Sequence, residues 1–174
     1  MILKYGNIWS NYGFSEHKIL ITTNSFVKNN GELVMEKGLA KEAKEKFSDL
    51  PKKCGDMILG MNCHMKFYGM MMISKYIGIF QVKYDWNDFA NLEIIKNSTK
   101  MLDKLSRRNQ EYVFNLNFPG IGNGRLTYNQ VFPIIKIMPN NVLVWQSKET
   151  KPLKKFAIEN SENDGEKLTK ELFE

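Results

Sequence analysis

Tyr112-Val113-Phe114-Asn115-Leu116 is an apolar run that leads directly into the glycine-rich stretch Phe118-Pro119-Gly120-Ile121-Gly122-Asn123-Gly124. The run is typical of a buried strand, and a helical pattern restarts at Thr127, whose hydroxyl can cap a helix while Gln130 reaches back. This order predicts an α/β unit with its glycine loop at the carboxyl edge of a sheet. Free N–H groups at such a helix N-terminus bind anions such as phosphates.

Strand and helix patterns alternate along the rest of the chain. The expected strands are Ile2–Tyr5, His17–Thr23 and Asn141–Trp145. The expected helices are one that follows Gly38 and is stopped by Pro51, and one over Asn91–Arg107. The segment Asp56–Lys83 is expected to be a meander of short strands, because glycines divide it. This alternation predicts an α/β fold of three layers, α/β/α, with a central mixed sheet.

Length and composition describe an ordinary folded domain. The chain has 174 residues, of which 43% are hydrophobic and 25% charged, which excludes wholesale disorder, collagen and a disulfide scaffold. The most apolar stretch, Met70–Phe80, is interrupted by Lys75 and falls short of the roughly 20 residues of a membrane span. No secretory core follows Met1, so a cytoplasmic protein is expected, in the host cytoplasm if a phage encodes it.

The composition changes after Ser147. Residues 148–155 are mainly basic and residues 159–166 are polar and acidic. We therefore expect one domain over residues 1–147 and a charged C-terminal tail over residues 148–174, which either stays on the surface or docks a short helix.

Charge and cysteine content indicate partners only coarsely. Lys and Arg number 25 against 19 Asp and Glu, so the net charge is +6. This surplus favours phosphate-bearing partners, nucleic acid among them, or simply forms a solvated face. Cys54 and Cys63 lack the spacing of a zinc site, so we expect two free thiols and no metal.

A second glycine-bearing segment, Gly31–Ala40, also leads into a helix. One such loop is most simply a tight turn, but two in one small domain favour a cradle for a diphosphate. Neither loop has the Gly-Lys-Ser/Thr of a Walker motif or the spacing of the dinucleotide-binding fingerprint. A non-Walker diphosphate site is therefore predicted.

Lys83 follows an apolar strand pattern and is flanked by Tyr84 and Trp86. Burial there would lower the pKa of the lysine, and a neutral amine is a nucleophile or a base. The alternative is a surface lysine whose stem lies along the aromatic rings. Asn24 likewise follows a buried strand and is, taken alone, a turn residue.

Taken together, these segments resemble the macrodomains, a family that binds ADP-ribose, over most of Met1–Gln146. Gly6-Asn7-Ile8 resembles the family's Gly-Asp-Ile/Leu, whose acidic side chain takes the adenine amine. Thr23-Asn24 followed by Gly31–Ala40 is similar to the catalytic-loop pattern Asn…Val-Met-Gly-x-Gly-Ile-Ala. Pro119–Leu126 resembles the second phosphate loop, Pro-x-x-Gly-x-Gly.

The resemblance implies a set of ligand-binding residues. The diphosphate would lie between the two glycine loops, with the distal ribose near Asn24 and Lys83. The implied set is Asn7, Ile8, Val34, Met35, Glu36, Gly38, Leu39, Pro119, Gly120, Ile121, Gly122, Asn123, Gly124 and Arg125.

A subgroup match is sharper. Phe80-Gln81-Val82-Lys83 with Trp86, Leu92-Glu93 and Ile95 resembles Phe-Pro-Thr-Lys-x-x-Trp…Leu-Glu-x-Ile of macrodomains that release ADP-ribose from DNA thymidine. The resemblance implies a hydrolase without a cofactor that removes ADP-ribose from nucleic acid or protein. Lys83 would act as nucleophile or base at C1 of the distal ribose, and Asn24 would orient a ribose hydroxyl or a water.

Three departures keep other functions open. Asn7 replaces the adenine-reading Asp, and Glu36 replaces a loop glycine and either weakens phosphate binding or points outward. Gly124-Arg125-Leu126 lacks the Asp that follows the glycine loop in the human-type glycohydrolase. One alternative is a non-catalytic binder that sequesters ADP-ribose-like nucleotide signals, such as a phage counter-defence protein. The Asn-, Lys- and Met-rich composition is typical of a phage or AT-rich bacterium. The other is an ADP-ribose 1''-phosphate phosphatase that relies on Asn24 and spares Lys83.

Overall fold

The structure is a computed structural model that describes residues 1–61 and 67–146. The described strands form one sheet in the order β1-β6-β5-β2-β4-β3, in which β3 and β4 are antiparallel and every other pair is parallel. The expected tail over residues 148–174 and the thiol of residue 63 lie outside the described residues. The strands are β1 (Ile2–Tyr5), β2 (His17–Thr23), β3 (Met70–Met72), β4 (Ile77–Gln81), β5 (Val113–Asn117) and β6 (Val142–Gln146).

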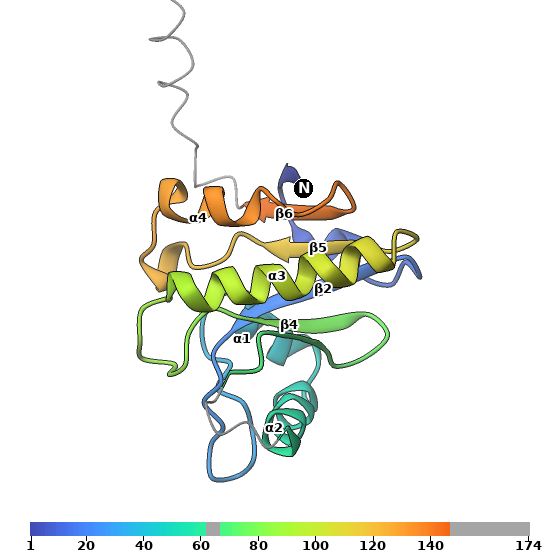
Figure 1. Ribbon diagram of the computed structural model, residues 1–174. Coiled ribbons are helices and arrows are strands. Elements are labelled where there is room, and N and C mark those ends of the chain that lie inside the picture. The colour runs from blue at the N-terminus through green and yellow to red at the C-terminus, as the bar shows by residue number, and fades with distance from the viewer. Residues whose placement is uncertain (62–66, 147–174) are drawn as a thin grey trace, which may run out of the picture.

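Helices cover both faces of this sheet, as Figure 1 shows. The described α-helices are α1 (Gly38–Lys46), α2 (Leu50–Gly60), α3 (Leu92–Arg108) and α4 (Tyr128–Ile135); η1 (Ile8–Asn11) and η2 (Gly122–Gly124) are single 3-10 turns. α3 and α4 lie on one face, and α1 and α2 lie on the other. The predicted three-layer α/β/α fold with a central mixed sheet is confirmed.

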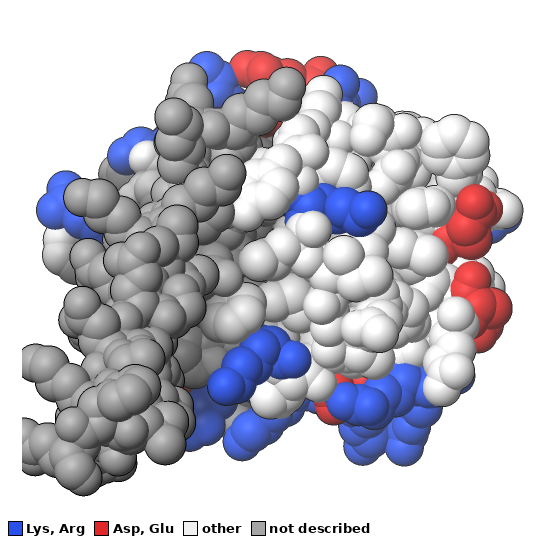
Figure 2. Space-filling model, turned by 90° about the horizontal axis from the view of Figure 1, so that it is seen from above, with Lys and Arg blue, Asp and Glu red and all other residues white. Residues whose placement is uncertain are grey.

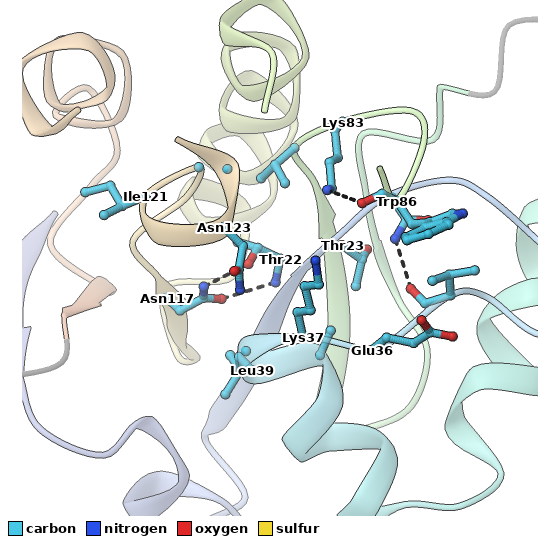
Figure 3. A pocket seen from close by; sticks show the side chains of 17 residues that line it. Thr22, Thr23, Glu36, Lys37, Leu39, Lys83, Trp86, Asn117, Ile121 and Asn123 are labelled. Atoms are coloured by element: carbon cyan, nitrogen blue, oxygen red, sulfur yellow. Dashed lines mark hydrogen bonds between the residues drawn. The ribbon is translucent and has the colours of Figure 1, made fainter. Parts of the chain in front are cut away.

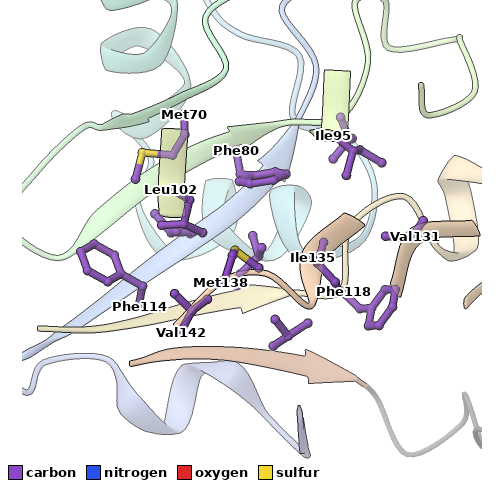
Figure 4. Close-up of a cluster of buried hydrophobic side chains, with 14 of the residues drawn as sticks. Met70, Phe80, Ile95, Leu102, Phe114, Phe118, Val131, Ile135, Met138 and Val142 are labelled. Carbon is purple, nitrogen blue, oxygen red and sulfur yellow. The ribbon is translucent and has the colours of Figure 1, made fainter. Parts of the chain in front are cut away.

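β2 shows why the sheet is covered on both sides. Leu20 packs into the core beneath α3 and α4, whereas Ile19 and Ile21 pack into the core beneath α1 and α2. Successive side chains of a strand point to opposite faces, so an unbroken apolar run needs a layer on each side. Figure 4 shows the first of these cores, in which Phe80 and Phe114 of the sheet meet the helices.

Local signals account for the starts of the two helices on that face. The side chain of Asn91 accepts hydrogen bonds from the main-chain N–H groups of Glu93 (2.9 Å) and Ile94 (3.2 Å), which caps α3. Before α4, Gln130 Oε1 accepts from the N–H of Thr127 at 2.9 Å, so the predicted capping box is confirmed.

The segment between the two halves of the sequence differs from the prediction. Pro51 does not stop a helix: α1 ends at Lys46, and Pro51 lies in the first turn of α2, where a missing N–H costs no hydrogen bond. α2 continues to Gly60, so the expected meander is wrong for its first part. Gly78 does not break a strand but lies inside β4, where a Cβ would come within 2.6 Å of Leu20 Cδ2.

The strand directions bring distant loops together. β1, β2, β4, β5 and β6 are mutually parallel, so the segments that follow β2, β4 and β5 leave the sheet at the same edge. Ligands of open α/β sheets bind at this carboxyl edge. Of the helices within residues 1–61 and 67–146, none combines the length and the apolar character needed to cross a membrane.

Candidate functional site

A cavity opens at the carboxyl edge of the sheet, where the three segments meet (Figure 3). Its volume is about 140 Å³, less than the 300 Å³ or so of a typical small-molecule pocket. Its lining residues are Thr22, Thr23, Asn24, Val34, Glu36, Lys37, Gly38, Leu39, Ala40, Val82, Lys83, Trp86, Asn117, Gly120, Ile121, Asn123 and Gly124. The structure thus brings both glycine loops, Asn24 and Lys83 to one hollow.

A second cavity of about 630 Å³ adjoins the first. Leu39 and Asn117 line both, so the two hollows are neighbours, and together they are called the cleft. The second cavity is lined by Gly6, Asn7, Ile8, Leu39, Glu42, Asn117, Trp145 and Gln146. The predicted residues Asn7 and Ile8 therefore lie at the far end of the cleft from Lys83.

Four residues of the expected ligand set do not line either hollow. Met35 is 1% exposed and packs into the core beneath α1 and α2. Pro119 is buried, and Gly122 begins η2 with a φ of +72°. Arg125 places its guanidinium 4.4 Å from the centre of the Phe89 ring.

The two glycine loops face each other across the first cavity. Gly38 has a φ of +55°, and a Cβ there would lie 3.7 Å from Nδ2 of Asn123 in the opposite loop. Gly120 has a φ of +76°, and a Cβ there would come within 3 Å of Leu126 and Ile95. Glycine is the residue that adopts this backbone without strain, so both loops depend on it.

Asn24 ties the first loop to the end of β2. Its Nδ2 donates to the carbonyl of Val34 at 2.9 Å, and its Oδ1 accepts from the N–H of Phe26 at 2.8 Å. The side chain is 6% exposed, and the main-chain carbonyl of Asn24 accepts from the buried hydroxyl of Tyr68 at 3.2 Å. Asn24 therefore positions the loop as well as lining the cavity.

The side chain of Asn117 links the ends of the central strands β2 and β5. Its Nδ2 donates to Oγ1 of Thr22 at 2.8 Å, and its Oδ1 accepts from the N–H of Thr22 at 3.1 Å. These bonds continue the pairing of β2 and β5 beyond the last paired residues. Sequence reasoning missed Asn117, although a polar residue directly after a buried strand is the signal that singled out Asn24.

Lys83 lies just beyond β4, half-buried at the wall of the cavity. Its Nζ donates to the main-chain carbonyls of Trp86 (2.6 Å) and Asp88 (2.9 Å). Burial lowers the pKa of this ammonium, and the positive charge of Lys37 lowers it further, while Asp88 and Asp85 oppose the shift. The neutral amine is therefore more accessible at Lys83 than at an ordinary surface lysine.

Glu36 is turned away from the cradle. Its carboxylate pairs with Nζ of Lys28 at 3.0 Å, and about half of the side chain is exposed. In Figure 3 the side chain lies to one side of the space between the loops. Of the two alternatives left open for Glu36, the structure shows the outward one.

Other charged groups are arranged less specifically. Figure 2 shows one face of the molecule, on which Lys and Arg side chains lie mostly at the margins of a largely uncharged centre, with acidic side chains among them. On this face the net positive charge is thus not gathered into one patch. Among residues 1–61 and 67–146, no group of three or more His, Cys, Asp or Glu side chains is arranged to hold a metal ion.

No protein-family model matches the sequence, and no curated protein matches it. Several solved structures are similar. Thermosipho africanus DarTG in complex with ADP-ribose superimposes with a TM-score of 0.67 at 16% identity, over 87% of this chain but only 43% of that one, so this chain spans less than half of it. The macrodomain of Thermus aquaticus DarG gives a TM-score of 0.63 at 21% identity, over 83% of this chain and 96% of that one.

The macrodomain of Mycobacterium tuberculosis DarG gives a TM-score of 0.60 at 17% identity, over 83% of this chain and 97% of that one. Identities this low establish the arrangement of the chain and not its chemistry. The layers, the order of the strands and the match to these solved domains agree. The chain therefore has the macrodomain fold.

Proposed function

We propose that the cleft binds ADP-ribose and that the protein hydrolyses ADP-ribosyl linkages. The adenine occupies the cavity beside Asn7 and Ile8, the diphosphate lies between the two glycine loops, and the distal ribose lies beside Asn24 and Lys83. The lining residues that the two hollows share, Leu39 and Asn117, support this extended pose. So does the solved complex of a similar domain-containing protein, DarTG, with ADP-ribose.

Lys83 is the residue on which catalysis depends. Two of the three N–H groups of its ammonium are engaged by the carbonyls of Trp86 and Asp88. Loss of the third proton leaves a neutral amine whose lone pair points away from both carbonyls. This arrangement beside the cavity is the single observation that carries the proposal.

In the reaction, the amine attacks C1 of the distal ribose and the bond from C1 to the acceptor breaks. The acceptor leaves with its electron pair and takes up a proton. Water then adds at C1 and displaces the amine of Lys83, so the net products are ADP-ribose and the protonated acceptor. Main-chain N–H groups of the loop that ends at Gly38 and of the loop at Gly120 hold the diphosphate and so position C1.

Binding and turnover are tested separately. Calorimetry with ADP-ribose is expected to show binding, and the absence of heat at millimolar ligand would contradict the pose. Incubation with ADP-ribosylated single-stranded DNA and with ADP-ribosylated protein is expected to release free ADP-ribose from at least one of them. The substrate that is turned over identifies the acceptor class.

A second candidate is a binder without catalysis. The amide of Asn24 is engaged with Val34 and Phe26, and the segment Gly124-Arg125-Leu126 lacks the second carboxylate of the human-type glycohydrolase. Both observations favour sequestration of an ADP-ribose-like nucleotide. Binding of ADP-ribose without release from DNA, from protein or from ADP-ribose 1''-phosphate would select this candidate over both enzymes.

A further inference from the structure

Lys37 is a charged residue of the cleft that takes no part in the binding and reaction steps described above. It precedes α1 as its N-terminal cap position, with extended backbone (φ −138°, ψ 150°), and it lines the first cavity. Figure 3 shows its side chain rising from the start of α1 into the space between the two glycine loops, toward Thr22 and Asn123. The ammonium therefore enters the hollow that these loops enclose.

The ammonium of Lys37 is unpaired within residues 1–61 and 67–146. Two lysines before and after it in sequence are engaged: Lys28 pairs with Glu36 at 3.0 Å, and Lys41 pairs with Glu45 at 3.7 Å. Lys37 has neither an ion pair nor a side-chain hydrogen bond within those two ranges. A cation that points into a cavity without a counter-ion is available to an anionic ligand.

The other charged residues that line the cavity also leave Lys37 available to an anionic ligand. The charged residues of its lining are Glu36, Lys37 and Lys83, and the carboxylate of Glu36 is taken by Lys28. Nζ of Lys83 is held by two main-chain carbonyls on the other side of the cavity. Within the lining, Lys37 is thus the cation left free to meet a ligand between the loops.

We propose that Lys37 contacts the diphosphate of the ligand directly and makes the cleft selective for a nucleotide that carries this doubly charged bridge. The inference rests on the proposed function for the identity of the nucleotide but not for the anion itself. Glycine loops alone offer partial charges, whereas Lys37 adds a full charge that approaches the bridging phosphates from the α1 side. Because the site is open to solvent, the contact weakens as salt is added.

The test compares two substitutions that each remove one positive charge from the same segment. Lys37→Met removes the cation in the cavity, and Lys41→Met removes an exposed cation outside it. Calorimetry with ADP-ribose is expected to show roughly tenfold weaker binding for Lys37→Met and a change of less than about twofold for Lys41→Met. Lys37→Arg keeps the charge and is expected to bind nearly as the unmodified protein does.

Two further probes separate this inference from the proposed function. Adenosine, which lacks the diphosphate, is expected to bind equally to Lys37→Met and to the unmodified protein. Inorganic pyrophosphate is expected to bind the unmodified protein and to lose affinity in Lys37→Met. Pyrophosphate binding that depends on Lys37, without binding of ADP-ribose, would support the role of Lys37 and overturn the proposed nucleotide.

Binding of ADP-ribose that is equal in Lys37→Met and the unmodified protein would overturn the role of Lys37 and leave the proposed nucleotide standing. An equal loss in Lys37→Met and Lys41→Met would also overturn it, because the effect would then follow from net charge alone. An unmodified protein that binds neither pyrophosphate nor ADP-ribose would overturn both.

Discussion

Two lysines at opposite edges of the sheet make an instructive comparison. Lys18, in β2 at the amino edge, is 6% exposed, donates to the carbonyl of Ser15 at 2.8 Å and lies 4.0 Å from the centre of the Tyr112 ring. Lys83, at the carboxyl edge, donates to two carbonyls beside a cavity. Burial lowers the pKa of both, and a nearby lysine adds to the shift in each case.

The two environments differ in what lies beyond the ammonium. At Lys18 the aromatic rings of Tyr76 and Tyr112 lie over the charge. At Lys83 the space beside the amine is a hollow that also receives Lys37 and both glycine loops. Desolvation alone therefore does not make a functional lysine; access for a ligand distinguishes the two.

The largest expected difference between Lys83 and Lys18 is in catalytic activity. Lys83→Met is expected to lower the rate of ADP-ribose release by at least about 100-fold, because a nucleophile or base is removed from the reacting carbon. Lys18→Met is expected to keep the rate, because Lys18 lies at the other edge of the sheet. The measurement is free ADP-ribose released from a modified substrate.

Calorimetry with ADP-ribose serves as the control, since Lys83→Met should still bind the nucleotide. Equal activity in Lys83→Met and the unmodified protein would remove Lys83 from the reaction. An equal loss in Lys83→Met and Lys18→Met would make the effect one of folding.

The next largest effect is expected in the pH dependence of the rate. A reaction that needs the neutral amine speeds up as the pH rises through the pKa of Lys83, which lies below its ordinary 10.5. The charge of Lys37 disfavours the ammonium, so Lys37→Met is expected to move this midpoint upward and lower the rate near neutral pH at saturating substrate. Asp85 and Asp88 are unchanged in that variant and continue to favour the ammonium.

Lys37→Arg keeps the positive charge and is expected to retain the original midpoint. A midpoint that is the same in Lys37→Met would show that the two lysines do not interact.

A smaller effect is expected from the ion pair that holds the carboxylate of Glu36 away from the bound diphosphate. Lys28→Met releases Glu36 from its ion pair, and the freed carboxylate is expected to repel the diphosphate and weaken ADP-ribose binding by roughly threefold. The double variant Lys28→Met/Glu36→Gln is expected to recover the affinity. Lys53→Met, which breaks the ion pair between Lys53 of α2 and Asp49, the residue before that helix, is the control.

If the affinity of the double variant stayed as low as that of Lys28→Met, the carboxylate of Glu36 would not be the cause. Calorimetry at low salt gives the largest difference, since added salt screens this partly exposed group.

The smallest expected effect concerns Lys18 and stability. Its pKa is lower in the fold than in the unfolded chain, so between these two pKa values the unfolded chain binds more protons. The free energy of unfolding of the unmodified protein is therefore expected to rise with pH toward 10.5, relative to that of Lys18→Met. Urea denaturation at a series of pH values measures this, and parallel curves for the two proteins would contradict it.

Local signals made much of this fold predictable. Strand β2 was predicted with its observed bounds, and α3 begins at the cap that Asn91 provides, one residue after the predicted start. The helix before α2 was predicted to continue to Pro51, because proline ends helices, yet proline also starts them. Which role it takes depends on the surrounding chain, and here Pro51 is buried at the start of α2.

Some residues of the site were likewise predictable from the sequence, and others were not. The two loops were predicted because glycine is required where φ is positive, as at Gly38 and Gly120. Lys37 and Asn117 were missed. Lys37 has no distinctive pattern, and Asn117, which follows a strand pattern as Asn24 does, bonds to Thr22, far away in sequence. The orientation of Glu36 was open for the same reason, because it is settled by Lys28, eight positions away in sequence.

The order of residues by itself determined the alternation of strands and helices, the glycine loops that follow two strands and the positions of the cap residues, because periodicity, backbone freedom and capping act over a few neighbours. Only the tertiary structure decided that Lys83 faces a hollow while Lys18 is covered by tyrosines, and that Lys37 enters the hollow without a partner among the described residues. Burial and electrostatic fields are summed over every group nearby in space, and parallel strands bring those groups together from distant parts of the chain.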